Sequence, residues 1–279
     1  MSNPLFAELI ARRYGASTPE VLREFADTAN PVLETLLDHK SVRQFKKEPL
    51  AAGTVELLAT AAQSAASSSN LQAWSVVALQ NEEHKAAAAT LCGNQQFIRD
   101  APLFMVFIAD LARLYWICEH EKQPTEGLEF FEMFLVAALD AALAAQNMAV
   151  ASEGLGLGIC YAGAARNHPR ELADLLKLPS HSIALFGMAI GHPQDDLKTT
   201  AKPRLPQSGL LHYETYSSEQ WPTEIEAYNQ TMAEFYESQQ MNAHQSWSQS
   251  SAKRVCRKES LSGRDVLRQI LEERGFGLR

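Results

Sequence analysis

Residues 39–45 carry side chains that could bind a small anion. In order, these are His39, Lys40, Ser41, Val42, Arg43, Gln44 and Phe45. A lysine, a hydroxyl and an arginine within four residues offer several donors to one phosphate, and a guanidinium can take two of its oxygens. The same pattern also fits a solvated basic corner, because short basic motifs often occur by chance.

A second basic pair follows about 160 residues later, at Lys202 and Arg204. Pro203 and Pro206 hold this segment extended, so the two cations, placed two residues apart, should project to the same side. The alternatives are a proline-rich surface loop and a PxxP ligand for a recognition domain.

Three polar or glycine-rich clusters lie between the basic segments. A dinucleotide fingerprint would follow a strand and open a helix, whereas the glycine-rich run 154–164 follows a helix, so we reject a Rossmann site. Its small residues leave main-chain groups open to a flat ligand. The candidate residues in these clusters are Ser67, Ser68, Ser69, Gln95, Tyr161, Ala162, Gly163 and Ala164.

Hydrophobic periodicity places these clusters on a mixture of helices and strands. The predicted helices are 5–13, 19–27, 31–38, 55–66, 82–91, 127–153 and 169–177, and the predicted strands are 74–80, 103–109 and 183–190. Two of the strands are continuous apolar runs, typical of strands buried on both faces. The 127–153 helix is apolar nearly all round, so it forms the centre of a domain or packs against a second subunit.

Composition is that of an ordinary globular protein, with 279 residues, 46% hydrophobic and 21% charged. The net charge of -8 argues against a nucleic-acid binder, although residues 253–279 carry +4. That basic tail could dock on the acidic remainder of the protein, on a second subunit or on an anionic ligand. We take docking of one of these kinds as the default expectation. The four cysteines show no metal-ligand spacing. We find neither a signal peptide nor an apolar run of about 20 residues, and expect a cytoplasmic protein without membrane contact.

Sequence motifs for hydrolases, phosphate loops and zinc or calcium sites are absent. The best polar signals are ligand-binding clusters, not acid–base pairs. If the protein is an enzyme, a cofactor is therefore expected to supply the chemistry.

Taken together, in their order along the chain, these clusters resemble the nitroreductase family. The resemblance is to its oxygen-insensitive nitroreductase and flavin reductase branch. The resemblance runs from about Leu33 to Arg279, and it also includes 175–179 and 185–187. It implies an α+β fold with a mixed central sheet wrapped by helices, an intertwined homodimer, and a tightly bound FMN. Residues 31–279 would form the FMN-binding domain, with 206–279 wrapping the partner subunit and 1–30 as a helical extension.

By matching position, the resemblance assigns each cluster a part of the cofactor. Arg43, Lys202 and Arg204 would hold the FMN phosphate, with His39, Lys40 and Ser41 around the phosphate and ribityl chain. Ser67, Ser68, Ser69 and Gln95 would meet the ribityl chain and the polar edge of the ring. Tyr161, Ala162, Gly163 and Ala164 would line the ring through main-chain groups.

The resemblance implies ping-pong reduction, with NADH or NADPH as hydride donor and nitroaromatics, quinones or free flavins as acceptors. No catalytic side chain and no metal is needed. Relatives that use NADPH carry arginines in the loop matching 237–246, where this chain has none, so we predict a weakened NADPH preference. The alternatives are a non-catalytic flavin-binding regulatory dimer and a dehalogenase or flavin-degrading enzyme of the same fold.

Overall fold

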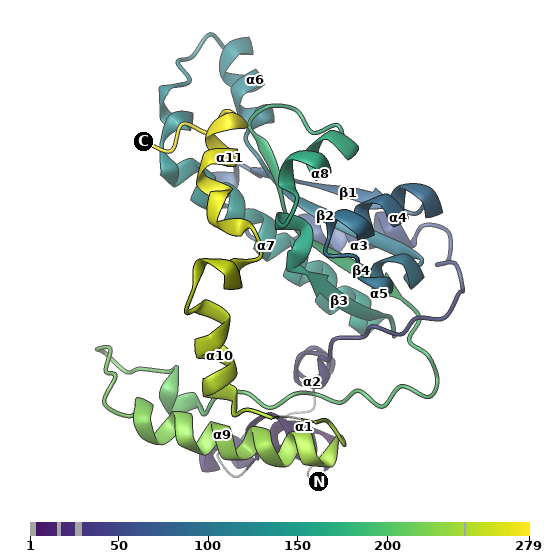
Figure 1. Cartoon of the computed structure of the whole chain (residues 1–279), viewed down its shortest axis with the longest axis vertical. Helices are drawn as coiled ribbons and strands as arrows, with labels where there is room; N and C mark the ends of the chain where they lie inside the picture. The colour runs from purple at the N-terminus through teal and green to yellow at the C-terminus, as the bar shows by residue number, and fades with distance from the viewer. Residues whose placement is uncertain (1–3, 16–17, 26–29, 243) are drawn as a thin grey trace. The chain divides into compact units, whose positions relative to one another are not determined.

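The computed structural model describes residues 4–15, 18–25, 30–242 and 244–279, which group into two compact units. Unit 1 comprises Met1–Lys40 and Lys198–Leu261, and unit 2 comprises Ser41–Leu197 and Ser262–Arg279. Figure 1 labels the elements of both units. The predicted division into an extension over 1–30 and a domain over 31–279 stays a prediction.

Unit 2 is built on a four-stranded sheet with the order β1–β2–β4–β3. Its strands are β1 (Trp74–Leu79), β2 (Leu103–Asp110), β3 (Gly158–Ala162) and β4 (Ser182–Gly191). The two central strands, β2 and β4, are the two continuous apolar runs of the sequence, and all of β2 up to Ala109 is buried. The prediction of buried strands is therefore confirmed.

The sheet is antiparallel, which corrects the mixed sheet that the family resemblance implied. The parallel pairing described in unit 2 is a single bridge between Ser41 and Ile159. It does not extend because the chain moves on at once to the end of β4, where Phe45 forms an antiparallel bridge with Pro193. A segment that changes neighbours within four residues adds no strand to the sheet.

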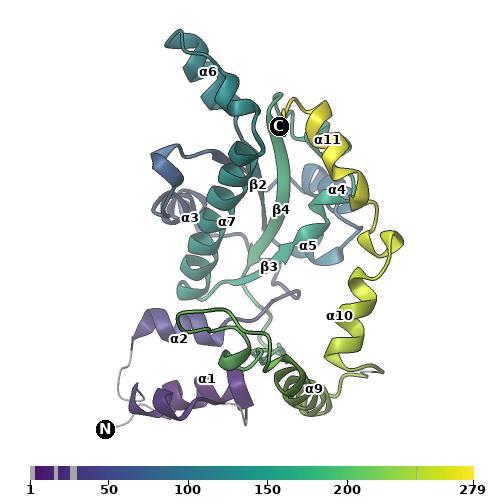
Figure 2. The same cartoon turned by 90° about the vertical axis from the view of Figure 1, so that its left-hand side faces the viewer.

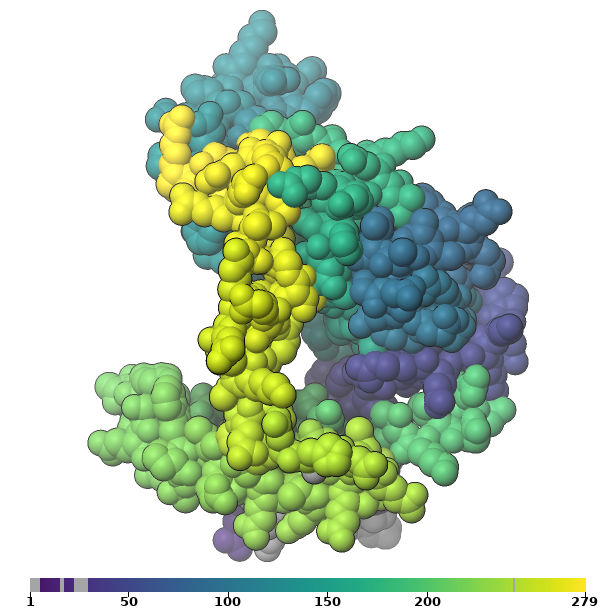
Figure 3. Space-filling model, in the orientation of Figure 1, coloured from purple at the N-terminus to yellow at the C-terminus, as the bar shows by residue number. Residues whose placement is uncertain are grey.

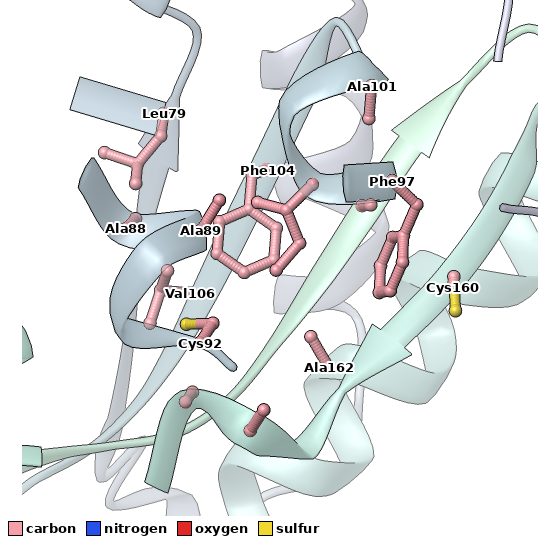
Figure 4. Packing of buried hydrophobic residues seen from close by; sticks show 14 of the residues in the cluster. Leu79, Ala88, Ala89, Cys92, Phe97, Ala101, Phe104, Val106, Cys160 and Ala162 are labelled. Atoms are coloured by element: carbon pink, nitrogen blue, oxygen red, sulfur yellow. The ribbon is translucent and has the colours of Figure 1, made fainter. Parts of the chain in front are cut away.

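Helices cover both faces of this sheet, and Figure 2 shows α3 and α7 on one side with α4 and α5 on the other. Side chains of β2 alternate between the two layers, as the period of a strand requires. Phe104, Val106 and Ile108 pack toward α4, α5 and α8, and Figure 4 shows Phe104 and Val106 among their neighbours. Leu103, Met105 and Phe107 pack toward α3 and α7. These helices are α3 (Thr54–Gln63), α4 (Glu82–Leu91), α5 (Gln96–Asp100), α7 (Phe131–Gly154) and α8 (Pro169–Leu175).

Helix α7 is the long apolar helix predicted over 127–153, and it starts later because Glu126–Glu129 form a 3₁₀ turn. By length and composition α7 could cross a membrane, and 44% of its most apolar stretch is buried in the protein. Core helices of soluble proteins pass the same test. Its buried face packs on the sheet and on α3, which supports the first of its two expected places, the centre of a domain.

The end of the basic tail docks on unit 2, and Figure 3 shows this yellow segment lying against the teal part of the surface. Arg274 donates hydrogen bonds to the carbonyl oxygens of Leu178, Pro179 and Ser182. The docked segment includes α11 (Leu267–Glu273), and unit 2 also contains α6 (Ala112–His120) and 3₁₀ turns at Ser68–Asn70, Gly163–Arg166 and Arg264–Val266. Of the three docking partners considered for the tail, the structure therefore shows the body for residues 262–279.

Unit 1 is helical in its described residues. It contains α1 (Pro4–Tyr14), α2 (Pro31–Asp38), α9 (Trp221–Ser238) and α10 (Trp247–Val255), with 3₁₀ turns at Glu20–Phe25, Gln207–Gly209 and Lys258–Leu261. Helix α2 begins at Pro31, as the predicted range 31–38 has it, and Asn30 caps it through its side chain, which accepts from the Val32 and Leu33 amides. Of the predicted helix 19–27, residues 20–25 form the 3₁₀ turn and residues 26 and 27 lie outside the described residues.

Candidate functional site

In unit 2, the segment with Ser41 and Arg43 runs beside the first residues of β3. The Val42 amide donates to the Ile159 carbonyl oxygen at 2.8 Å, and Val42 itself is buried. Arg43 is exposed, with its guanidinium carbon 5.9 Å from the centre of the Phe97 ring. Burial raises the pKa of the Cys160 thiol, and the charge of Arg43 opposes that rise. The arginine thus carries its positive charge to the edge of β3.

Residues 161–164 continue β3 into a 3₁₀ turn, and Gln95 lies in the loop that packs on this turn. A Cβ atom at Gly93 would lie 3.4 Å from the Ala164 Cβ and 4.0 Å from the Gln95 Cγ. Gln95 Oε1 is buried and has no hydrogen-bond partner among the described residues. The structure therefore brings the loop of Gln95 close to Ala164, at the end of the strip 161–164, and leaves Gln95 Oε1 as an acceptor without a described partner.

Arg166 lies in the same 3₁₀ turn as Gly163 and Ala164. It is half-buried and donates a hydrogen bond to the Leu185 carbonyl oxygen. A Cβ atom at Gly163 would meet the Arg166 Nη2 at 3.5 Å. Burial lowers the pKa of Arg166, and the nearby charge of Arg264 lowers it further. The side of the 161–164 strip that faces Arg166 is therefore electropositive, which suits an electron-rich or anionic ligand.

Ser67, Ser68 and Ser69 begin a loop, the serine loop (residues 67–73), which is held by Asp140 of α7. The Asp140 carboxylate accepts from the Ser67 hydroxyl at 2.7 Å, from the Ser68 amide at 3.0 Å and from the Ala73 amide at 3.1 Å. Asp140 is only 2% exposed. Sequence reasoning missed this residue, although a lone carboxylate in an apolar helix was the available signal.

The serine loop keeps three residues other than glycine in the left-handed region. Their φ angles are 48° at Ser69, 55° at Asn70 and 51° at Gln72. Such conformations are unfavourable for residues with a Cβ and persist where neighbouring contacts enforce them, often at ligand sites. Arg113 adds a contact at the other end of the loop by donating to the Gln72 and Trp74 carbonyl oxygens.

Four predicted residues lie in unit 1, and we call them the basic cluster: His39, Lys40, Lys202 and Arg204. Ala201 and Pro203 are buried, whereas Lys202 and Arg204 are exposed, so the two cations project to one side as predicted. Lys40 forms an ion pair with Asp38 at 2.6 Å. The Lys202 Nζ lies 6.0 Å from the centre of the Tyr236 ring.

Arg13 of α1 joins the two segments of the basic cluster. Its guanidinium donates to the carbonyl oxygens of Leu37 at 2.7 Å, His39 at 2.6 Å and Lys202 at 3.0 Å. Arg13 is 5% exposed. Sequence reasoning missed it because nothing local distinguishes it from its exposed neighbour Arg12.

Unit 1 also holds a cavity of about 540 Å³ between α9 and the start of α10. Part of its lining comes from the 237–246 loop, which the sequence had marked for its missing arginines. Among the described residues, those that line the cavity include no lysine and no arginine, and they do include a carboxylate, Glu237. A phosphate would meet no strong cation from this lining.

Comparison with known proteins places the chain in the nitroreductase family. The model of the Nitroreductase family matches residues 36–192, and that of the Nitroreductase family, C-terminal domain, matches 202–279. The chain therefore belongs to this family, as the sequence motifs indicated.

Two curated relatives come from Bacillus subtilis strain 168. One, an FMN reductase (NADPH), is 36% identical over 251 residues, which cover 88% of this chain and 98% of the relative. The other, an FMN reductase [NAD(P)H], is 38% identical over 254 residues, again 88% and 98% of the two chains. The solved structure of the NfrA1 nitroreductase from B. subtilis superposes with a TM-score of 0.82, 36% identity and coverage of 88% of this chain and 99% of that one.

Proposed function

We propose that the protein is an FMN-dependent NAD(P)H oxidoreductase that reduces small planar acceptors, such as nitroaromatics, quinones or free flavins. Family membership and the names of the relatives support the reaction class. The structural observation that supports the proposal is the buried Gln95 Oε1, which has no hydrogen-bond partner among the described residues and lies in the loop whose Gly93 approaches the Ala164 side chain.

The residues present fit FMN by their chemistry. An acceptor such as Gln95 Oε1 suits the ring N–H or a ribityl hydroxyl of a flavin. The exposed cations Arg43, Lys202 and Arg204 suit a phosphate carrying a charge of about -1.5 to -2. Ser41 and the serine loop offer hydroxyl and amide donors for the ribityl chain and the polar edge of the ring.

Bound FMN would carry a hydride from the reduced nicotinamide to the acceptor, in two half-reactions at one place. The chain's own residues bind and orient. His39, Lys40 and Ser41 would lie around the phosphate and ribityl chain, and the 161–164 strip would hold the ring through main-chain groups. The positive charge of Arg166 beneath that strip would favour a ring that gains electrons. No side chain is assigned as a proton donor.

The nicotinamide donor is proposed to bind with a weakened preference for NADPH. A 2'-phosphate would find no lysine or arginine among the described residues that line the cavity beside α9, and it would approach Glu237. Each missing charge-assisted hydrogen bond weakens the free energy of NADPH binding by about 1.5 to 3 kcal/mol. We therefore expect kcat/KM for NADH to equal or exceed that for NADPH.

Steady-state kinetics with both nicotinamides test this expectation, and Gln245→Arg provides a gain of function. A cation at this exposed lining position should raise kcat/KM for NADPH relative to NADH by about tenfold, the effect of one charge-assisted bond. Gln245→Met controls for side-chain size. A wild-type ratio strongly in favour of NADPH would contradict this assignment.

We also propose that the protein is a homodimer in the cytoplasm. One face of α7 exposes four large apolar side chains, spaced four residues apart, in unit 2: Phe131, Leu135, Leu139 and Leu143. Each is between 41% and 54% exposed. An apolar row of this length is typical of a surface that a second copy covers. The free thiols Cys92 and Cys160 are consistent with a reducing compartment.

Leu139→Glu tests the dimer. In a two-fold interface the substitution is present in both subunits, so dimerisation would bury two carboxylates. We therefore expect the dimer dissociation constant to rise at least about tenfold. Sedimentation or light scattering over a concentration series measures it. Ala87→Glu adds the same charge at an exposed position on α4, which covers the other face of the sheet, and should leave the mass unchanged. A wild-type monomer, or a Leu139→Glu protein that dimerises normally, would contradict this interface.

A further inference from the structure

We propose that Arg13, on the N-terminal helix α1, is a positioning residue that braces the basic cluster and so sets its affinity for phosphate. The inference rests on the proposed function, because the residues that it positions are those proposed to hold FMN. Helix α1 lies outside both stretches matched by the family, which begin at residue 36 and at residue 202. The brace is therefore a feature of this chain's added segment.

The first contact of the brace is with the end of α2. The last carbonyl groups of a helix have no partner within it, and cations near this end are stabilising. Helix α2 carries no basic residue in its own last turn. Arg13 fills that place, with Nε 2.7 Å from the Leu37 oxygen and Nη2 2.6 Å from the His39 oxygen. The direction in which the chain leaves α2, toward Lys40, is thereby fixed.

The second contact is with the segment that carries the other two cations. Arg13 Nη1 donates to the Lys202 carbonyl oxygen at 3.0 Å, and the Arg204 amide donates back to the Arg13 carbonyl oxygen at 2.7 Å. The next carbonyl, that of Pro203, accepts from the Tyr228 hydroxyl at 2.9 Å. Lys202 and Arg204 are both exposed, and the Arg204 guanidinium also donates to the carbonyl oxygens of Lys202 at 3.0 Å and Pro203 at 3.2 Å.

The contacts of Arg13 are those of a brace and not of a ligand-binding group. Arg13 is 5% exposed, and its guanidinium links α1, which carries it, to two other elements: the end of α2 and the 202–204 segment. The adjacent Arg12 provides a natural contrast. It is exposed and pairs with the carboxylates of Glu8 at 2.6 Å and Asp38 at 3.9 Å.

The experiment compares Arg13→Ala, Arg13→Lys and Arg12→Ala by titrating the full-length apoprotein with FMN and with riboflavin, which lacks the phosphate. For Arg13→Ala we expect about a tenfold loss of FMN affinity, equivalent to one misplaced charge-assisted bond, with riboflavin affinity unchanged. Arg13→Lys should recover part of the loss, and Arg12→Ala should match the wild type. If Arg13→Ala leaves the ratio of FMN affinity to riboflavin affinity unchanged, whether both stay constant or both fall equally, the proposal is overturned. General destabilisation would not depend on the phosphate.

A measurement without flavin separates this inference from the proposed function. Hydrogen exchange of the apoprotein should show the Arg204 amide exchanging about tenfold faster in Arg13→Ala and unchanged in Arg12→Ala, because local opening governs exchange. If the wild type binds no FMN, the proposed function fails while this result still decides whether Arg13 braces the cluster. An Arg204 amide that exchanges equally in all variants would overturn the brace.

Discussion

Replacing Asp140 with alanine is expected to lower the free energy of unfolding by about 3 to 5 kcal/mol and to abolish stable FMN binding. The change leaves the Ser68 and Ala73 amides and the Ser67 hydroxyl without their acceptor. Without it, the left-handed residues of the serine loop can relax to ordinary backbone conformations. Urea unfolding measures the stability, and flavin fluorescence measures the binding.

Asp140→Asn separates the hydrogen-bond pattern from the volume of the side chain. Its amide group must face either the Ser68 amide or the donors from Ser67 and Ala73, so one donor meets another. We expect Asp140→Asn to lower the free energy of unfolding and the FMN affinity nearly as much as Asp140→Ala does. The control is Ser152→Ala, also buried on α7, whose hydroxyl donates to the Met148 carbonyl oxygen of its own helix. An Asp140→Asn protein with normal stability and FMN affinity would show that Asp140 does not hold the loop.

Replacing Arg43 with alanine is expected to weaken FMN binding about 100-fold while leaving the fold intact. A guanidinium can give a phosphate two charge-assisted bonds, each about 1.5 to 3 kcal/mol, and every 1.4 kcal/mol is tenfold in affinity. In the structure Arg43 is exposed, and its described contact is with the Phe97 ring, worth about 0.5 to 1 kcal/mol at an exposed site. Thermal unfolding of the apoprotein should therefore change little.

The control for Arg43 is Lys47→Ala, which removes another exposed positive charge from the same segment. It should leave FMN affinity within about twofold, because a solvated charge at a distance is screened by salt. If Arg43→Ala binds FMN as well as the wild type does, residues 39–45 are a solvated basic corner and the phosphate assignment is wrong.

The sequence predicted the parts of the fold in which local pattern decides structure. The Asn30 cap, the start of α2 at Pro31 and the two buried central strands were all predictable, because capping and continuous apolar runs are local signals. The 3₁₀ turn at 20–25, in place of a helix, marks where the amphipathic pattern was short. The mixed sheet was implied by the family resemblance alone, and the sequence could not correct it because strand direction depends on pairing, which no local pattern encodes.

The sequence could name candidate residues that would contact a ligand directly, but not residues that act by holding other residues in place. Gln95 was named from its motif, and its loop approaches Ala164 in the structure. Asp140 and Arg13 were missed because their partners lie 67 to 73 and 24 to 189 residues away. The role of a buried carboxylate or guanidinium can be assigned only once its hydrogen-bond partners are known.

One measurement tests the central claim most directly, an anaerobic titration of the purified protein while its flavin absorbance is recorded. We predict one FMN per chain, loss of the oxidised-flavin band with one equivalent of NADH or NADPH, and full return of the band with one equivalent of a quinone or nitroaromatic. Flavin that binds but is not reduced would indicate a regulatory dimer. Irreversible loss of the band would indicate a flavin-degrading enzyme. Protein expressed with ample FMN that carries none would contradict the account.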